Sequence, residues 1–286
     1  EIYFNLGNVL QQSGKLIQSI DIYKNVLRIN PNNLGACNNL GNVYFKLQKI
    51  EDAIKCYSRV LKLDPNNKKM DYLINALTGN TVSTAPLSYV ENLFDDYAYN
   101  FDEYLSNLDY LAPKKISDII KRLIINIRRP SILDLGCGTG LIGKELKDKN
   151  ITIEGVDLSK KMLKQAKLKN VYKKLYKNSI TEFLNSSDLN FDIFVCSDVF
   201  IYVGELSQIF YLIKKRNRNS GYLIFSTEHT EAAGYVLEKS ARYSHSKEYI
   251  EILCNKYEYK LERFEKIKLR KETGNFIIGG IYMLKF

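Results

Sequence analysis

The stretch that most constrains the fold is SILDLGCGTG, residues 131–140. Its opening residues predict a short buried strand with Asp134 at the carboxyl end. Glycines at alternate positions follow, and they let the backbone turn tightly and approach a ligand that a Cβ atom would obstruct. Helical spacing of apolar residues then runs over 141–149. The stretch therefore predicts a strand, a ligand-binding turn and a helix, as in an open α/β sheet.

A second acid lies where a second strand should end. Residues 151–156 predict that strand, and Asp157 follows it. An acid at this place suits the hydroxyls of a ribose. The glycines are spaced G-x-G-x-G, whereas an NAD site requires G-x-G-x-x-G. The pattern therefore indicates a nucleoside ligand other than NAD.

This arrangement resembles the first motif of the class I S-adenosylmethionine (SAM) methyltransferases, and LSKKMLKQA (158–166) resembles the continuation of their second motif. The resemblance implies an α/β Rossmann-like domain with a seven-stranded sheet, SAM as cofactor and S-adenosylhomocysteine as product. At Ser179 the family often carries an acid that bonds the adenine, so the chain departs from the pattern there. The implied cofactor contacts are Asp134, Gly136, Cys137, Gly138, Gly140, Asp157, Leu158, Met162, Ser179, Ile180 and Ser197.

The first 80 residues contain an internal repeat. Residues 6–33 align without gaps on residues 40–67, an offset of 34, and 12 of these 28 positions are identical. The period, the paired helical patterns and a closing proline resemble the tetratricopeptide (TPR) repeat. Residues 69–77 predict a capping helix. Because two repeats are fewer than the usual three, we expect an all-α domain that is truncated at its N-terminus.

TPR arrays commonly hold a protein or peptide in a concave groove, so the resemblance implies such a partner. Dimerisation, which would make a homo-oligomer, and bracing of an enzyme are the alternatives. Asn8 and Asn42 share one position of the repeat and could face a groove. A polar face in contact with water is the simpler interpretation of either residue.

Between the repeats and the glycine-rich stretch lies a segment dense in aromatic and acidic residues. FDDYAYNFDEYL (94–105) resembles the segment before the first motif in TPR-containing methyltransferases, where a helix covers the SAM site. That resemblance implies a cofactor contact for Tyr97, whereas Phe94 and Phe101 are expected in the core. The expected regions are 1–80 (TPR repeats), 81–112 (linker and aromatic lid helix) and 113–286 (methyltransferase domain).

The fourth strand, predicted at 193–196, should end beside the reactive methyl group. Asp198 is expected to orient the acceptor or to cap the next helix, and Tyr202 is a weaker catalytic candidate. Enzymes that methylate the amines of bases often carry an Asn/Asp-Pro-Pro-aromatic motif here. This chain has none, because its prolines all precede residue 131. The sequence therefore argues against a nucleic-acid acceptor.

SARYSHSKEYI (240–250) also resembles the TPR-containing methyltransferases. We expect Arg242 and Tyr243 to contact the substrate from the loop after a fifth strand at 221–226. His245, one of two histidines, is the candidate general base. A structural histidine at the start of a helix is the alternative. Strands near 259–267 and 276–286 should complete the sheet, with the last one antiparallel.

The charge, the cysteines and the length of the apolar runs limit the partners, metal sites and cellular compartments that the sequence predicts. The net charge of +10 could favour an anionic partner, but the eight lysines of residues 160–177 lack arginines and stacking aromatics and predict a solvated face. The five cysteines form no CxxC pair, which argues against a metal site and favours a reducing cytoplasm. The sequence contains no run of 18 apolar residues, so it predicts no membrane span.

The sequence thus predicts a SAM-dependent methyltransferase that acts on an N or O acceptor. A protein or peptide presented by the TPR groove is the favoured acceptor. The first alternative is a small-molecule O- or N-methyltransferase whose repeats oligomerise or scaffold. The second is a TPR interaction protein with a vestigial SAM site, and the intact glycine-rich turn speaks against it.

Overall fold

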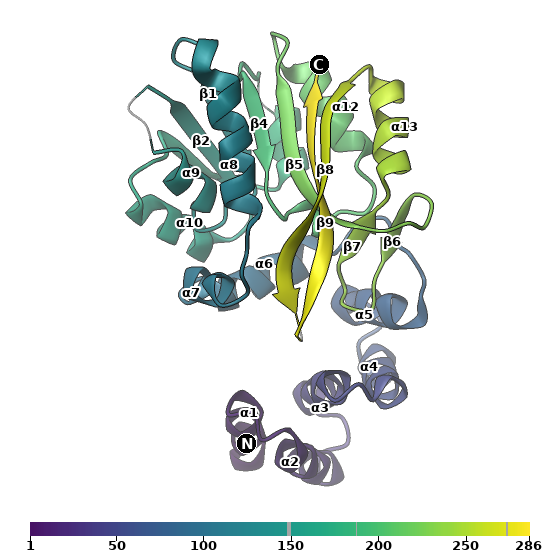
Figure 1. Ribbon diagram of the computed structural model, residues 1–286. Coiled ribbons are helices and arrows are strands. Elements are labelled where there is room, and N and C mark those ends of the chain that lie inside the picture. The colour runs from purple at the N-terminus through teal and green to yellow at the C-terminus, as the bar shows by residue number, and fades with distance from the viewer. Residues whose placement is uncertain (148–149, 187, 273) are drawn as a thin grey trace. The chain divides into compact units, whose positions relative to one another are not determined.

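The computed structural model describes residues 1–147, 150–186, 188–272 and 274–286. It divides into two compact units (Figure 1). The helical unit comprises residues 1–82 and 238–241, and the sheet unit comprises residues 83–237 and 242–286.

The helical unit contains two helical hairpins and a further helix, as the internal repeat predicts. Its helices are α1 (Ile2–Gln12), α2 (Leu16–Ile29), α3 (Leu34–Lys46), α4 (Ile50–Leu63) and α5 (Lys68–Thr78). The side chain of Asn33 accepts a hydrogen bond from the N–H of Ala36, and Asn67 does the same for Met70. These bonds satisfy a free N–H at the start of α3 and of α5. The repeated Pro-Asn-Asn sequence therefore both ends one helix and begins the next.

A contact between glycine and tyrosine recurs inside each hairpin. A Cβ atom on Gly7 would lie 2.6 Å from the ring of Tyr23, and one on Gly41 would lie 2.5 Å from the ring of Tyr57. Each tyrosine hydroxyl donates to the asparagine that follows the glycine, Asn8 or Asn42, at 2.8 Å. These asparagines therefore fasten their own hairpin, which sequence periodicity does not reveal.

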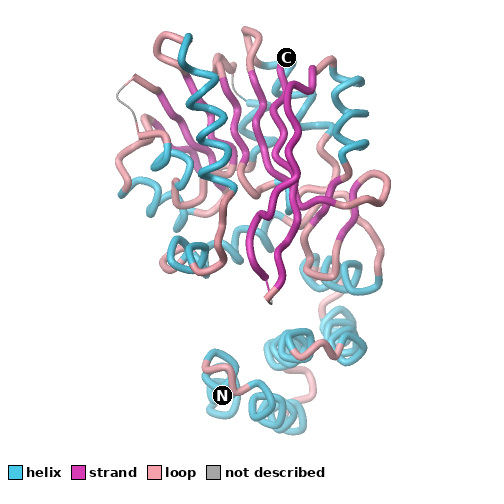
Figure 2. The backbone as a smooth tube through the Cα atoms, in the orientation of Figure 1, coloured by secondary structure: helices cyan, strands magenta, loops and turns pink. Residues whose placement is uncertain are grey.

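The sheet unit is an open, mostly parallel sheet, as predicted. Its strands are β1 (Ser131–Leu135), β2 (Thr152–Asp157), β3 (Lys174–Lys177), β4 (Ile193–Cys196), β5 (Tyr222–His229), β6 (Tyr235–Leu237), β7 (Tyr243–His245), β8 (Lys260–Glu272) and β9 (Asn275–Lys285). The order β3-β2-β1-β4-β5 is parallel, and β9 then pairs antiparallel with β5 and β8 with β9. These are the seven strands expected, and the antiparallel last strand is confirmed. The short β6 and β7 extend the sheet beyond the end of β4 (Figure 2).

Helices cover both faces of this sheet (Figure 1). The helices described in this unit are α6 (Leu87–Tyr97), α7 (Phe101–Ser106), α8 (Ala112–Leu123), α9 (Leu141–Glu145), α10 (Lys160–Leu168), α11 (Ile180–Ser186), α12 (Ser207–Arg216) and α13 (Lys247–Tyr257), with single turns of 3-10 helix η1 (Ile124–Asn126) and η2 (Phe200–Tyr202). Of these, α6 and α7 lie at the edge of the sheet where the parallel strands end (Figure 1). Within the described ranges, none of the helices combines the length and the apolar character needed to cross a membrane.

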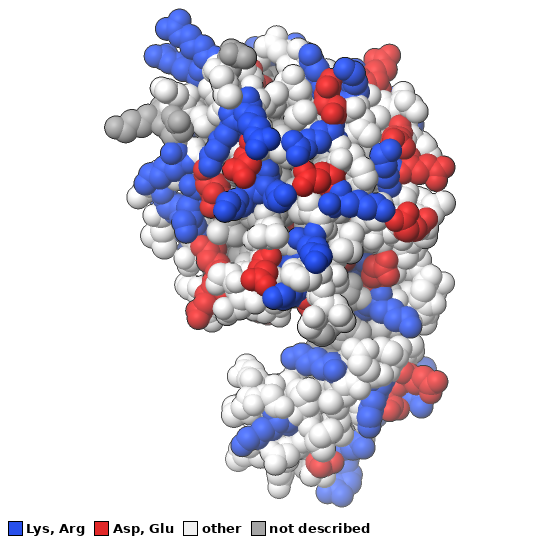
Figure 3. Space-filling view, viewed as in Figure 1, with Lys and Arg blue, Asp and Glu red and all other residues white. Residues whose placement is uncertain are grey.

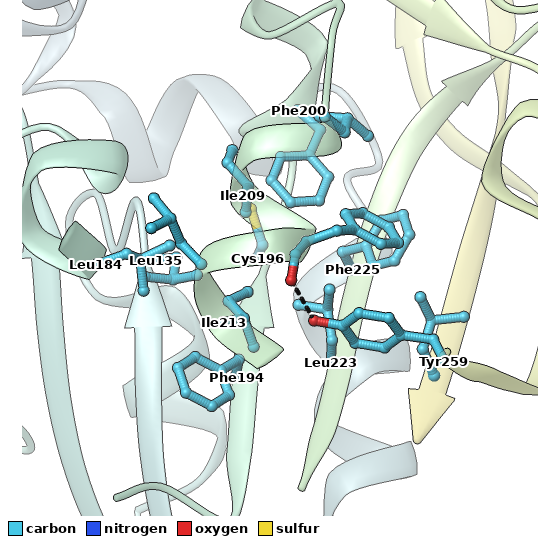
Figure 4. Packing of buried hydrophobic residues seen from close by; sticks show 14 of the residues in the cluster. Leu135, Leu184, Phe194, Cys196, Phe200, Ile209, Ile213, Leu223, Phe225 and Tyr259 are labelled. Carbon is cyan, nitrogen blue, oxygen red and sulfur yellow. Dashed lines mark hydrogen bonds between the residues drawn. The ribbon is translucent and has the colours of Figure 1, made fainter. Parts of the chain in front are cut away.

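Side chains alternate between the two faces of each strand, so β1 contributes to two cores. Leu133 and Leu135 pack with α11, α12 and α13, whereas Ile132 packs with α8 and α9. Figure 4 shows the first core, in which the hydroxyl of Tyr259 donates to the backbone oxygen of Phe210 at 2.8 Å. By the same alternation, Asp134 lies on the face of Ile132.

The structure corrects several predicted bounds. The single helix expected across the aromatic segment is broken at residues 98–100, so α6 and α7 are separate. Phe94 and Phe101 would be about 10 Å apart along one helix, but the break brings their ring centroids to 5.9 Å. Residues 83–85, expected as linker, bond through their backbone to residues 202 and 205.

Two further elements near the glycine-rich stretch are shorter than predicted. The helix expected over 141–149 ends at Glu145, and residues 148–149 lie outside the described residues. The third strand, expected from residue 171, begins at Lys174. Tyr172 leaves the line of that strand because its ring packs against glycines of the neighbouring elements.

Candidate functional site

The glycine-rich turn has the backbone conformation that its glycines permit. Gly136, Gly138 and Gly140 all have positive φ angles, of 74°, 53° and 87°. A Cβ atom on Gly136 would lie 2.3 Å from Val199, whereas one on Gly138 would meet nothing within 4 Å. Gly138 therefore faces open space beyond the turn, and this is the place where a ligand can approach the backbone.

Backbone bonds fix this turn to the neighbouring strand. The N–H groups of Gly136 and Cys137 both donate to the carbonyl of Val156, at 2.7 and 3.0 Å. Asp157 accepts from the N–H of Gly138 and from the N–H of Ser159, each at 2.8 Å. Burial raises the pKa of Asp157 to about 6, although these N–H donors act in the opposite direction. Asp157 thus lies between the turn and the start of α10, as the sequence predicts.

Asp134 is buried beneath the turn. The hydroxyl of Tyr172 donates to its Oδ2 atom at 2.7 Å. Burial raises the pKa of Asp134 to about 7; the bond from Tyr172 lowers it, and the charge of Asp157 raises it further. Burial also raises the pKa of the adjacent Cys137 thiol. Asp134 therefore lies beneath the turn, with its carboxylate bonded to Tyr172.

The remaining predicted cofactor residues differ in exposure. Leu158 and Ile180 are partly exposed, whereas the side chain of Met162 is wholly buried. The hydroxyl of Ser179 accepts from the N–H of Glu182 at 3.3 Å, so it caps α11. Ser197, at the end of β4, lies 3.0 Å from the hydroxyl of Tyr110.

Two acidic residues of the aromatic segment bond to the elements that build the turn. Asp95 on α6 accepts from the hydroxyl of Ser159 at 2.5 Å, and from the N–H of Lys161. Asp102 on α7 accepts from the hydroxyl of Thr139 and pairs with Lys169 at 2.7 Å. We call Asp95 and Asp102 the latch acids. The predicted lid therefore lies against the glycine-rich turn and α10.

Tyr97, the predicted lid contact, is 46% exposed. Its ring lies 5.8 Å from that of Tyr104. Burial raises the pKa of Tyr97, and the charge of Arg242 lowers it. Tyr97 is thus a half-exposed side chain close to the positive charge of Arg242.

Asp198 belongs to a buried network of charges. It has a positive φ of 53°, which is uncommon outside glycine. Its Oδ1 accepts from the hydroxyl of Ser226 at 2.7 Å, and its Oδ2 accepts from Arg270 at 3.0 Å. Asp198 caps no helix, because η2 begins after Val199 and α12 after Leu206. The capping alternative is therefore wrong.

The same network extends through two arginines. Arg270 on β8 is 5% exposed and also pairs with Glu228 on β5. Arg242 pairs with Glu272 through two bonds, of 2.6 and 3.1 Å, and lies 3.4 Å from Glu228. Arg242 thus contacts acids of this chain. Arg270, Glu228 and Glu272 were not predicted as site residues, and an arginine followed by Lys271 and Glu272 gave no signal of burial.

Tyr202 is also close to this network. Its ring packs edge-on against Phe94, with the centroids 5.3 Å apart. Burial raises the pKa of Tyr202, whereas the charge of Arg242 lowers it. Tyr202 therefore joins the aromatic segment to the charged network.

His245 does not lie in a loop, as was expected, but in strand β7, where it pairs with His229 of β5. The ring is fully buried, and Nε2 lies 3.0 Å from the carbonyl oxygens of both Val203 and Gly204. Burial lowers its pKa to about 4. Nε2 must therefore carry the proton that it donates to these carbonyls, and the ring is shielded from any acceptor. This corrects the predicted base to a structural histidine.

Tyr243, predicted to contact substrate, is likewise fully buried in β7. A Cβ atom on Gly204 would lie 2.6 Å from its ring. Its place is in the packing beneath the loop after β4, which corrects the predicted contact. Ser246, in contrast, accepts from the N–H of Tyr249 and caps α13.

Comparison with known families matches both units. A family model described as a methyltransferase domain matches residues 129–278. Two tetratricopeptide repeat models match residues 7–48 and 35–67. The chain is 27% identical, over 146 residues, to a ubiquinone biosynthesis O-methyltransferase of Rickettsia akari; the match covers 49% of this chain and 58% of that protein. The chain spans about half the length of the curated relatives it matches.

Solved structures share the fold at low identity. The magnesium protoporphyrin IX methyltransferase of Synechocystis PCC 6803, solved with SAM, has a TM-score of 0.53 and 15% identity, with 70% of this chain and 96% of that chain covered. The 1,6-didemethyltoxoflavin N1-methyltransferase of Burkholderia thailandensis has a TM-score of 0.54 and 14% identity, with 72% and 92% covered. These likenesses show the fold alone.

Proposed function

This chain belongs to the methyltransferase domain family, and from that premise we propose that it transfers a methyl group from SAM to a nitrogen or oxygen acceptor. The observation that carries the proposal is the open space at Gly138 beside Asp157, a residue that is partly exposed. A backbone free of side chains and an acid at a strand end are what a nucleoside requires.

The residues present fit SAM. Asp157 would accept from the ribose hydroxyls, and the turn around Gly138 would hold the methionine part. The negative charges of Asp134 and Asp157 suit a ligand with positive charge. Ile180 and Leu158 are partly exposed beside them and suit the adenine. Ser179, whose hydroxyl is used by α11, leaves a backbone group as the partner of the adenine amine.

SAM supplies an activated methyl group when it is bound. The protein must then align the acceptor and exclude water. The latch acids would hold α6 and α7 over the cofactor, and Ser197 and Tyr202 would border the acceptor. Asp198 is already bonded to Ser226 and Arg270, so it would orient the acceptor side of the site through this network.

A protein or peptide acceptor is the finer proposal, supported by the tetratricopeptide repeats, which commonly bind proteins. The name of the Rickettsia akari relative favours a small molecule with a hydroxyl acceptor as the second candidate. On the face of the sheet unit that Figure 3 shows, acidic side chains lie among the basic ones, and a nucleic acid is the less favoured acceptor.

Calorimetric titration with SAM tests the donor site. We expect Gly138→Ala to weaken SAM binding at least tenfold, because the added methyl group enters the open space. The control is Gly14→Ala, since Gly14 has a similar φ of 76° and equally open surroundings in the helical unit. Both changes should cost about 1–2 kcal/mol of stability through the strained φ. Equal SAM affinity in the two variants would contradict the site.

Transfer of labelled methyl from SAM decides the acceptor. The full chain is incubated with a cell extract that has been separated by size, and with a panel of phenols and amines. Label in the protein fraction supports the protein acceptor, and label on a phenol supports the second candidate. Bound SAM without transfer to any fraction would oppose catalysis.

A further inference from the structure

The ring of Tyr172 packs on glycines from three places around the donor site. Cβ atoms added to Gly140, Gly143 and Gly155 would each lie 2.8–3.0 Å from this ring. Gly140 ends the glycine-rich turn, Gly143 is in α9 and Gly155 is in β2. The turn, the helix after it and the neighbouring strand therefore share one aromatic side chain as their common packing surface.

The hydroxyl of Tyr172 joins two of these elements by hydrogen bonds. It accepts from the N–H of Gly143 at 3.3 Å and donates to Oδ2 of Asp134 at 2.7 Å. The N–H of Gly143 is in the first turn of α9 and has no partner within that helix. One hydroxyl thus satisfies a helix N–H and a buried carboxylate together.

We propose that Tyr172 is a positioning residue of the donor site, whose ring sets the shape of the glycine-rich turn and whose hydroxyl keeps Asp134 oriented and ionised for SAM. The inference rests on the proposed function, because it assigns to Asp134 a role toward SAM. It adds a residue outside the motifs that predict the site.

The other groups around Asp134 do not replace this hydroxyl. Asp157 on β2 carries a like charge and disfavours ionisation of Asp134. Cys137 in the turn and Cys196 on β4 are neutral, since burial raises the pKa of both thiols. A buried carboxylate needs a donor to remain charged. In the described part of the chain, Tyr172 is the group placed to donate to it.

The test is Tyr172→Phe in the full chain, which keeps the ring on the glycines and removes only the hydroxyl. In the protein without SAM, the carbon resonance of the Asp134 carboxyl group is followed by NMR as the pH is raised. Loss of a hydrogen bond to a charged group should move the midpoint upward by roughly one to two pH units. SAM affinity at neutral pH should fall roughly tenfold or more for the same reason.

Tyr176→Phe is the matched control. The hydroxyl of Tyr176 donates to Glu154 at 2.8 Å, so the same chemical change breaks the same kind of bond away from the turn. We expect it to leave the Asp134 midpoint and SAM binding unchanged. An unchanged Asp134 midpoint in Tyr172→Phe, or an equal shift in the control, would overturn the proposal.

A second variant keeps the test decisive if Tyr172→Phe does not fold. Asp134→Asn retains Tyr172 but cannot ionise at this position, so the change in SAM affinity that Asp134 causes around pH 7 should be lost, whereas the change that Asp157 causes around pH 6 should remain. Persistence of the wild-type pH dependence in that variant would also overturn the proposal. If the wild-type chain does not bind SAM, the proposed function fails, whereas the NMR titration still decides the role of Tyr172.

Discussion

The hydroxyl of Ser159 makes two hydrogen bonds beside the donor site: it donates to the carboxylate of Asp95 at 2.5 Å and accepts from the N–H of Met162 at 3.0 Å. The N-cap of α10 is therefore also the place where α6 is fastened. A single serine thus couples the start of the second-motif helix to the lid.

Because of this coupling, we expect the lid to slow the dissociation of SAM. Replacing both latch acids, Asp95→Ala with Asp102→Ala, should speed SAM dissociation by roughly tenfold, because all the charge-assisted bonds that these two carboxylates make to the turn and to α10 are lost. Stopped-flow displacement of SAM measures the rate.

Asp96→Ala is the control for the latch acids, since Asp96 is exposed on the same helix. It should leave the dissociation rate unchanged. The Ser159 hydroxyl lowers the pKa of Asp95, so this latch is present at neutral pH and is lost as the pH falls through that lowered value. Equal rates in the double variant and the wild type would show that the lid does not retain SAM.

Arg270 should be the most costly arginine of the chain to remove. Arg270→Met leaves the carboxylate of Asp198 without a countercharge and leaves Arg242 alone to pair with the buried Glu228, and we expect a loss of about 3–5 kcal/mol in the free energy of unfolding. Arg263→Met on the same strand breaks a pair with Glu265 whose side chains are 41% and 30% exposed. That control should cost less than about 1 kcal/mol. Urea unfolding of both variants makes the comparison, and similar losses would contradict burial of the network.

His245 should have no part in the pH profile of catalysis. Its pKa of about 4 keeps the ring neutral wherever the enzyme is folded and active. His245→Asn retains an N–H donor for the carbonyls of Val203 and Gly204, so kcat should stay within a few fold and its pH dependence should be unchanged. His245→Ala should mainly lower the melting temperature. Loss of the acidic limb of the kcat profile in His245→Asn, with the fold intact, would show that His245 is the general base after all.

Because Asp134 is buried, the free energy of unfolding should depend on pH, and the direction of this dependence can be worked out. Its pKa in the folded protein, about 7, is above the ordinary value of 3.8, so the folded state holds a proton that the unfolded state releases. The stability contributed by this group is therefore full below about pH 4 and is lost as the pH rises toward 7. Asp134→Asn removes this loss.

The melting temperature of Asp134→Asn relative to the wild type should accordingly rise from pH 4 to pH 8. Thermal unfolding of both proteins over that range is the measurement. A difference that stays constant with pH would show that Asp134 is ionised throughout, which would also weaken the case for its burial beneath the turn.

Local spacing was sufficient to predict the glycine-rich turn, the acid after the second strand and the helical repeats, because each lies within a few residues or one fixed period. Tyr172 and Arg270 could not be found in that way. They meet Asp134 and Asp198 across strands, with 38 and 72 residues between the partners. His245 was predicted to be the general base because histidine is rare in this chain. The rarity of a residue type does not show whether its side chain is buried.

The glycine, asparagine and tyrosine contact of each hairpin has a consequence for how the array can grow. Because Gly41, Asn42 and Tyr57 meet inside one hairpin, a duplicated copy of residues 34–67 would carry its own fastening with it. The repeat also carries Ile20 and Tyr23 over as Ile54 and Tyr57. Residues 34–67 therefore form a self-contained unit. Gain or loss of one such unit changes the length of the array without breaking the glycine, asparagine and tyrosine contacts inside the other hairpins.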